Sequence, residues 1–265
     1  MSHYQRIACL STEAVETLYA LGAEDVIAGI SGFTVRPPRA REEKTKISGF
    51  SSSSLERILA VQPDLVIGFC DMQADICRDL VKAGVEVHQF NQRTVEGILR
   101  MIGVLAALVQ REQAGKQLVA SLRAEIARAR ARAASWTRKP VIYFEEWNDP
   151  LMSGIGWAAE LIAMAGGVDA FPELSVHPGA KERIIADPLA VVRRAPDIII
   201  ASWCGKKFQP AQLMARAQWD TIPAVRKQML FEIKSPDILS PGPAAITEGL
   251  RQISDIVAQW QAAQT

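Results

Sequence analysis

The same short pattern occurs twice in this chain of 265 residues, and it restricts the choice of fold. Residues 55–69 read LERILAVQPDLVIGF, and residues 188–202 read PLAVVRRAPDIIIAS. In each copy a helical segment ends one residue before Pro-Asp, and an apolar segment follows at once. Proline cannot continue a helix and disfavours helical backbone in the residue before it. Each copy therefore predicts a helix that is followed directly by a buried strand.

Helices and apolar strands alternate on both sides of these copies. The expected strands are RIACLS (6–11), VIAGIS (26–31), DLVIGF (64–69), VEVHQF (85–90), VIYF (141–144), DIIIAS (197–202) and LFEI (230–233). Apolar strands that are separated by helices indicate parallel sheets with helices on both faces.

The alternation stops between residues 94 and 137, where no proline occurs. Two amphipathic helices are expected there, and the second would be about 35 Å long at 1.5 Å per residue. The prediction is an α/β protein with two Rossmann-like lobes, 1–93 and 138–265, joined by a bridging helical segment, 94–137. A ligand-binding cleft would lie between the lobes, and the two termini would lie in different lobes.

Composition excludes several classes of function. A formal net charge of +1 gives no electrostatic reason to expect nucleic acid or an anionic membrane as the partner. The chain is 49% hydrophobic and 22% charged, which is typical of a globular protein, and it contains no apolar run of the ~20 residues that a membrane span needs. We expect a monomer. The sequence as it reads predicts a cytoplasmic protein, or a periplasmic one if a leader peptide precedes it.

Polar and aromatic residues gather where the expected strands end. Ligands of parallel α/β sheets bind outside the carboxyl ends of the strands. The predicted ligand-binding residues are therefore Phe33, Asp71, Asn91, Glu145, Glu146, Trp147, Trp203, Lys206 and Asp237. Trp147 and Trp203 are expected to supply apolar contact area, because large amphipathic rings bury much surface at low entropic cost.

Two acids follow one another at the end of the expected strand 141–144. Side chains alternate along a strand, so Glu145 and Glu146 should point to opposite sides. They cannot form the facing carboxylate pair that glycoside hydrolysis requires. One of them is expected to face the cleft, with Trp147 at its lip, and the other to pair with a lysine or arginine on the lobe surface.

Metal binding and catalysis find little support in the sequence. Cys70 and Cys204 each follow a strand of the repeated pattern, so they are candidates for a soft-metal or redox site, although cysteine is also a common buried residue. No two histidines have the spacing of a structural zinc site, and no serine nucleophile elbow occurs. We therefore expect a binding protein that needs no cofactor, rather than an enzyme.

An ordered series of segments resembles a known family. The series is RIACLSTEAVETLYALGAEDVIAGI, LERILAVQPDLVIGF, AGVEVHQF, a long helix, SGIGWAAELIAMAGGVDAF and APDIIIAS. It is similar to the cobalamin and iron-siderophore substrate-binding proteins of ABC importers, and the similarity covers nearly the whole chain. The resemblance implies the class III architecture of periplasmic binding proteins, with two α/β lobes on a rigid helical backbone and little hinge motion.

The resemblance also implies a ligand and a partner. The ligand would be a metal-centred macrocycle or chelate, with cobalamin favoured over a ferric siderophore or haem. Haem is disfavoured because no histidine or tyrosine lies at the strand ends as an obvious axial ligand. A tetrapyrrole metal chelatase that uses Glu145 or Glu146 as a base is the alternative from another class. In the family an acid on each lobe docks on arginines of an ABC permease. Glu56 falls on the first of these positions, and Leu189 occupies the second.

Overall fold

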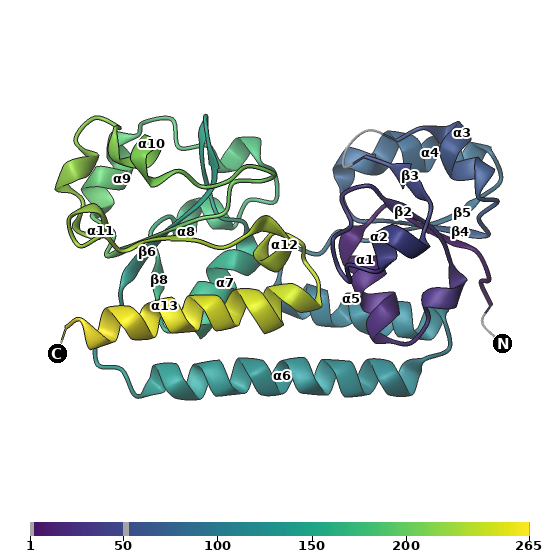
Figure 1. Ribbon diagram of the computed structural model, residues 1–265, viewed down its shortest axis with the longest axis horizontal. Helices are drawn as coiled ribbons and strands as arrows, with labels where there is room; N and C mark the ends of the chain where they lie inside the picture. The colour runs from purple at the N-terminus through teal and green to yellow at the C-terminus, as the bar shows by residue number, and fades with distance from the viewer. Residues whose placement is uncertain (1–2, 50–52, 265) are drawn as a thin grey trace. The chain divides into compact units, whose positions relative to one another are not determined.

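The computed structural model describes residues 3–49 and 53–264 (Figure 1), which divide into two compact units. Unit 1 comprises Met1–Gln92, Glu96–Leu122 and Pro241–Pro243, and unit 2 comprises Arg93–Val95, Arg123–Ser240 and Ala244–Thr265. Each unit contains its own β-sheet, so strand 141–144 and strand 65–69 belong to separate sheets. The expected α/β class with two sheets is confirmed.

Unit 1 is built on a five-stranded sheet in the order β3-β2-β1-β4-β5, and all neighbouring strands run parallel. The strands are β1 (Ile7–Cys9), β2 (Ile27–Ser31), β3 (Lys46–Ser48), β4 (Leu65–Gly68) and β5 (Glu86–Gln89). The helices are α1 (Thr12–Ala20), α2 (Ala40–Glu43), α3 (Leu55–Ala60), α4 (Ala74–Lys82) and most of α5 (Val95–Leu108), with 3-10 turns at Glu24–Val26 and Asp71–Gln73.

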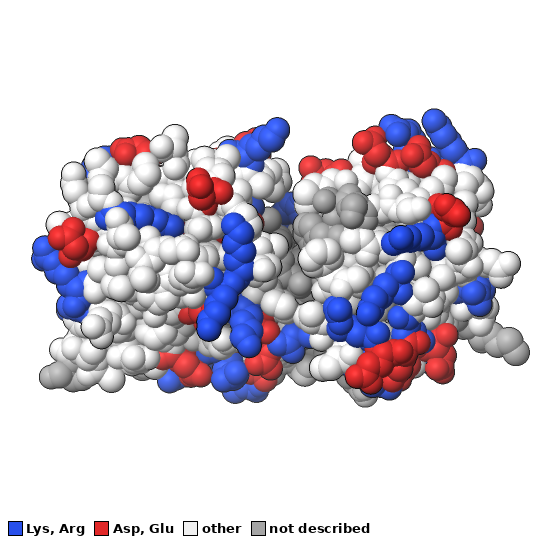
Figure 2. All heavy atoms as spheres, turned by 45° about the horizontal axis from the view of Figure 1, so that its top comes forward, with Lys and Arg blue, Asp and Glu red and all other residues white. Residues whose placement is uncertain are grey.

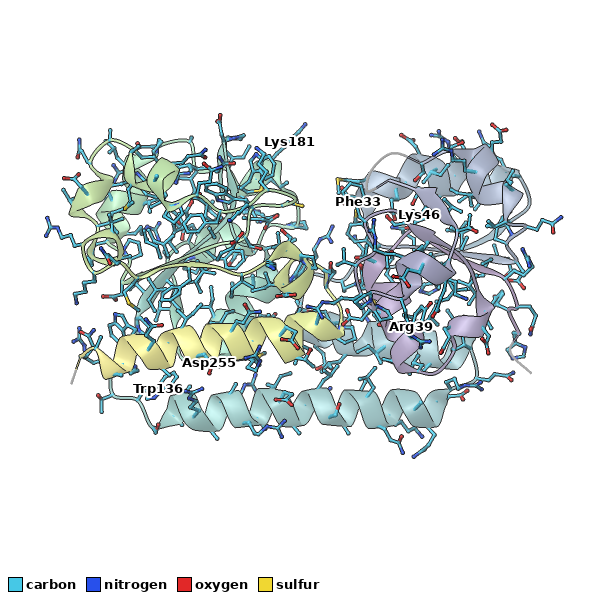
Figure 3. The ribbon with its side chains drawn as sticks, viewed as in Figure 1. Phe33, Arg39, Lys46, Trp136, Lys181 and Asp255 are labelled. Carbon is cyan, nitrogen blue, oxygen red and sulfur yellow. The ribbon has the colours of Figure 1, made fainter. Side chains whose placement is uncertain are left out.

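Strand β3 is not among the strands expected from the sequence. Within β3 only Ile47 is buried, and its neighbour Lys46 is exposed (Figure 3). A three-residue edge strand with one inward side chain is too short for the alternating pattern to stand out in the sequence.

Unit 2 is built on a mixed sheet in the order β10-β9-β6-β7, with β8 also pairing with β6. The strands are β6 (Val141–Asn148), β7 (Leu151–Ser153), β8 (Val168–Asp169), β9 (Ile198–Ala201) and β10 (Leu230–Glu232). Strands β6, β9 and β10 run parallel, whereas β7 folds back antiparallel to β6. Strand β6 continues to Asn148, so Glu145, Glu146 and Trp147 lie within the strand and not in a turn after it.

The helices of unit 2 surround this sheet and continue to the C-terminus. They are α7 (Gly156–Met164), α8 (Pro172–Ser175), α9 (Leu189–Arg194), α10 (Pro210–Met214), α11 (Pro223–Arg226), α12 (Ser235–Ile238) and α13 (Leu250–Ala262), with 3-10 turns at Lys181–Arg183 and Trp219–Thr221 and a π-helical turn at Ala245–Gly249. The chain passes from unit 1 to unit 2 within α6 (Glu112–Ala134). Among the described helices, none is both long and apolar enough to span a membrane.

The repeated Pro-Asp junction has the same geometry in both units. The residue before the proline has left-handed backbone in each copy, with φ 47° at Gln62 and φ 45° at Ala195. The aspartate carboxylate then accepts a hydrogen bond from the backbone at the start of the neighbouring strand. Asp64 accepts from the Arg6 amide at 3.0 Å, and Asp197 accepts from the Val141 amide at 3.0 Å. The junction therefore fixes the register of the central strand pair in each sheet.

Candidate functional site

Three of the predicted residues lie at the carboxyl edge of the unit 1 sheet. Phe33 follows β2, Asp71 begins the turn after β4, and Asn91 follows β5. All three are exposed, and Phe33 has 58% of its surface accessible (Figure 3). Met72, beside Asp71, is 54% exposed and was not predicted from the sequence. Exposed large apolar side chains at a strand-end edge are typical of a ligand-binding face.

Gln73 holds this edge together. Its side-chain oxygen accepts from the Phe69 amide at 2.9 Å, and its Nε2 donates to the Leu10 carbonyl at 3.2 Å. The two partners follow β4 and β1, so one buried amide bridges the ends of two neighbouring strands. The loops that carry Asp71 and Met72 therefore start from a fixed position.

Glu145 is fully buried, with 0% of its surface exposed. One carboxylate oxygen accepts from Nε1 of Trp203 at 2.8 Å and from Nη2 of Arg216 at 2.9 Å, and the other accepts from Nη1 of Arg216 at 2.6 Å. Trp203 is only 3% exposed and packs edge-on against Phe208. This burial revises the expectation that Trp203 and Glu145 offer surface to a ligand, because both side chains are used inside unit 2.

Glu146 also has an arginine partner, on the opposite side of the strand. Nη1 and Nη2 of Arg183 donate to its carboxylate at 2.5 and 3.1 Å, and Nη1 also donates to the Ser153 carbonyl at 2.7 Å. Arg183 is 2% exposed, so this partner is buried and does not lie on the unit surface as expected. Each glutamate is therefore held by a bidentate guanidinium.

Of the two predicted tryptophans, Trp147 is the one that is only half-buried. Its Nε1 donates to the Asp149 carbonyl at 2.7 Å, which fixes the ring against the β6–β7 hairpin. Lys206, which is exposed, places Nζ 4.0 Å from the ring centroid in a cation–π contact. Asp237, on α12, is half-buried and accepts from Nε2 of Gln252 at 3.1 Å.

The described residues include no group of three or more histidine, cysteine, aspartate or glutamate side chains that could hold a metal ion. Cys70 is buried in unit 1, and Cys204 lies in unit 2. Desolvation, with a smaller contribution from Glu146, raises the pKa of the Cys204 thiol, which disfavours the thiolate that a metal requires. The ring of His88 contacts that of Phe90 in a tilted arrangement with 4.3 Å between centroids, and burial lowers the pKa of His88.

The two positions that correspond to docking acids differ in character. Glu56 lies in the first turn of α3 and is exposed. Leu189, the first residue of α9, is half-buried and lines a pocket of about 590 Å³ together with Leu151, Ile184 and Pro188. On the visible surface basic and acidic side chains are interspersed within each unit (Figure 2), as the net charge of +1 suggests.

The sequence is similar to known binding proteins over most of its length. The profile of the periplasmic binding protein family matches residues 7–236. A vitamin B12-binding protein of Vibrio campbellii is 26% identical over 249 residues, which cover 89% of this chain and 84% of the relative. A cobalamin-binding protein of Halobacterium salinarum is 24% identical over 206 residues, covering 75% of this chain and 54% of that protein.

Solved structures show the same fold. The apo structure of the periplasmic haem-binding protein RhuT of Roseiflexus has a TM-score of 0.81 at 22% identity, covering 98% of this chain and 99% of its own. The periplasmic vitamin B12 binding protein of Vibrio cholerae has a TM-score of 0.78 at 19% identity, covering 97% and 98%. The resemblance drawn from the ordered segments is thereby confirmed, and the chain belongs to the periplasmic binding protein family.

Proposed function

We propose that this protein is a non-catalytic binding protein for a corrinoid such as cobalamin. The observation that carries the proposal is the similarity to the vitamin B12-binding protein of Vibrio campbellii, which extends over 89% of the chain. A vitamin B12-binding protein of Salmonella typhimurium, 27% identical over 205 residues and covering 76% of this chain and 74% of the relative, supports the same ligand.

Haem is the second candidate, because haem-binding proteins such as RhuT share the fold. Haem iron needs an axial side chain from the protein, whereas cobalamin carries its own axial ligands and can be held by apolar and amide contacts. Tyr143 is fully buried, Tyr19 donates to Glu43, and Tyr4 donates to Glu86. His88 is half-buried against Phe90, so these four side chains are buried or already engaged, whereas His177 is exposed.

The proposed ligand contacts are the accessible members of the predicted set. In unit 1 they are Phe33, Asp71 and Asn91, and in unit 2 they are Trp147 and Lys206. Aromatic rings would supply apolar contact to the corrin, and the polar groups would bond the amides at its rim. Glu56 is the proposed contact to a permease arginine. At the second docking position Leu189 lines a pocket and carries no charge, so the contact there would be apolar and not an ion pair.

Calorimetric titration with cyanocobalamin, haemin and a ferric hydroxamate siderophore tests this proposal. We expect cyanocobalamin to bind with a Kd of about 1 μM or tighter, which corresponds to about −8 kcal/mol, and the other two to bind at least tenfold more weakly. In gel filtration the absorbance of the corrin should then elute together with the protein. Tight binding of haemin without binding of cyanocobalamin would transfer the assignment to haem.

A further inference from the structure

Glu13 is a buried acid in unit 1. It lies in the first turn of α1 and is 2% exposed. Its carboxylate accepts from Nε2 of Gln92 at 3.3 Å and from the Thr12 hydroxyl at 3.2 Å, and within the described part of the chain it has no lysine or arginine partner. Burial raises the pKa of Glu13 to about 7, because these hydrogen bonds offset only part of the desolvation.

A short stretch of distant sequence is seated on this acid. Pro241–Pro243 groups with unit 1, although the residues on either side group with unit 2. Nε2 of Gln92, which donates to Glu13, also donates to the Pro241 carbonyl at 3.1 Å and contacts Sδ of Met101 at 3.1 Å. Gly242 lies directly against α1, and a Cβ at this position would be 2.6 Å from Cβ of Glu13. The stretch thus contacts Glu13 both through Gln92 and through its own backbone.

We propose that Glu13, Gln92 and the stretch Pro241–Pro243 form a proton-operated latch, in which the stretch stays seated on α1 while Glu13 is neutral and detaches when Glu13 ionises. The latch is independent of which ligand the protein binds.

Apart from these hydrogen bonds, the described surroundings of Glu13 supply no positive charge that would compensate an ionised carboxylate. Glu16, on the same helix, places a carboxylate oxygen 3.3 Å from the Cβ position of Gly242. Cys9, at the end of β1, stays neutral because burial and Glu13 raise the pKa of its thiol to about 12. Lys44 acts on Cys9 and forms no ion pair with Glu13 in the described structure. The seated stretch and Met101 are uncharged, so an ionised Glu13 would have only its hydrogen bonds to stabilise it in a closed site.

The direction of the pH dependence follows from proton linkage. Seated, Glu13 has a pKa of about 7, and once the stretch detaches the pKa returns toward the ordinary value of 4.5. Detachment therefore releases a proton between these two values, and the detached fraction rises by roughly tenfold per pH unit from about pH 5 to pH 7. Above about pH 7 the proton is lost from both states, and the ratio becomes constant.

Amide hydrogen exchange of peptides covering residues 238–246 measures this detachment. We would record it from pH 5 to pH 8 in the wild type, in Glu13→Gln and in Glu42→Gln, an exposed acid on α2 that serves as the control. Intrinsic exchange chemistry is the same in all three proteins, so the ratio of their protection factors isolates the latch. Protection in the wild type should fall by roughly tenfold per pH unit relative to Glu13→Gln up to about pH 7, and Glu42→Gln should behave as wild type.

Two further measurements keep the proposal open to refutation if Glu13→Gln does not fold. The infrared band of a protonated carboxyl in the wild type should titrate near pH 7 in step with the exchange of residues 238–246. Gly242→Ala should remove the protection at every pH, because its Cβ overlaps Glu13. The latch would be overturned if the ratio of the wild-type protection factor to that of Glu13→Gln did not change with pH. It would also be overturned if Glu13→Gln kept the pH dependence and Glu16→Gln abolished it.

Discussion

Replacing Glu145 with alanine should lower the free energy of unfolding by about 3–5 kcal/mol. The substitution leaves the Arg216 guanidinium without its bidentate acceptor and the Trp203 indole N–H without a partner. The side chain of Arg216 is only 17% exposed, so water cannot fully replace the lost carboxylate. An unpaired charge in a largely buried site lowers the free energy of unfolding by far more than the intact ion pair contributes to it.

Urea denaturation of Glu145→Ala, Arg216→Ala and the double variant measures this effect. The double variant should be less destabilised than the sum of the two single variants, because it removes both charges together. Glu173→Ala is the matched control, since Glu173 pairs with Arg194 at the surface and the side chains are 51% and 40% exposed. That exposed pair should contribute about 0–1 kcal/mol. A loss below about 1 kcal/mol for Glu145→Ala would show that the buried pair does not support the fold.

Replacing Trp147 with alanine should weaken binding of the corrinoid by roughly thirtyfold, or about 2 kcal/mol. Trp147 is half-buried, and its ring is held in place by Asp149 and covered on one face by Lys206, so it is preorganised for an apolar partner. Trp203→Ala is the informative contrast, because that ring is buried against Glu145 and Phe208. It should lower the melting temperature more than it changes the affinity measured on the folded fraction.

Calorimetry and thermal melting on both tryptophan variants separate these roles. If Trp147→Ala lowers the melting temperature but binds as wild type does, Trp147 only supports the hairpin and the ligand contacts lie elsewhere. Lys206→Met tests the charge of Lys206, both in the cation–π contact and as a proposed ligand contact, since it retains the aliphatic packing and removes the charge. We expect it to weaken binding less than Trp147→Ala does.

The class of fold could be predicted because its signals are local. Pro-Asp after a helix, continuous apolar strands and a proline-free helical segment each depend on a few neighbouring residues. The family resemblance used the order of these segments and needed no geometry. Strand β7 and the extension of β6 to Asn148 were missed, because Asp149-Pro150 reads as the end of a strand although the hairpin pairs Asn148 with Leu151.

The chemistry of the glutamates could not be predicted, because it depends on partners that are distant in sequence. Arg183 is 37 residues from Glu146, and Arg216 is 71 residues from Glu145. Alternation along the strand predicts opposite sides for the two acids, but it carries no information about the partner of each one. The proton site at Glu13 was missed for the same reason, since Gln92 and Gly242 reach it from 79 and 229 positions along the chain.

The Pro-Asp junctions also bear on the order in which the chain acquires its structure. Asp64 closes onto Arg6 across 58 residues, and Asp197 closes onto Val141 across 56. The entropic cost of closing a loop grows only with the logarithm of its length, so these two closures cost nearly the same. Loop length therefore gives neither sheet an advantage in forming first. The order of folding must depend on the side chains that pack around each junction.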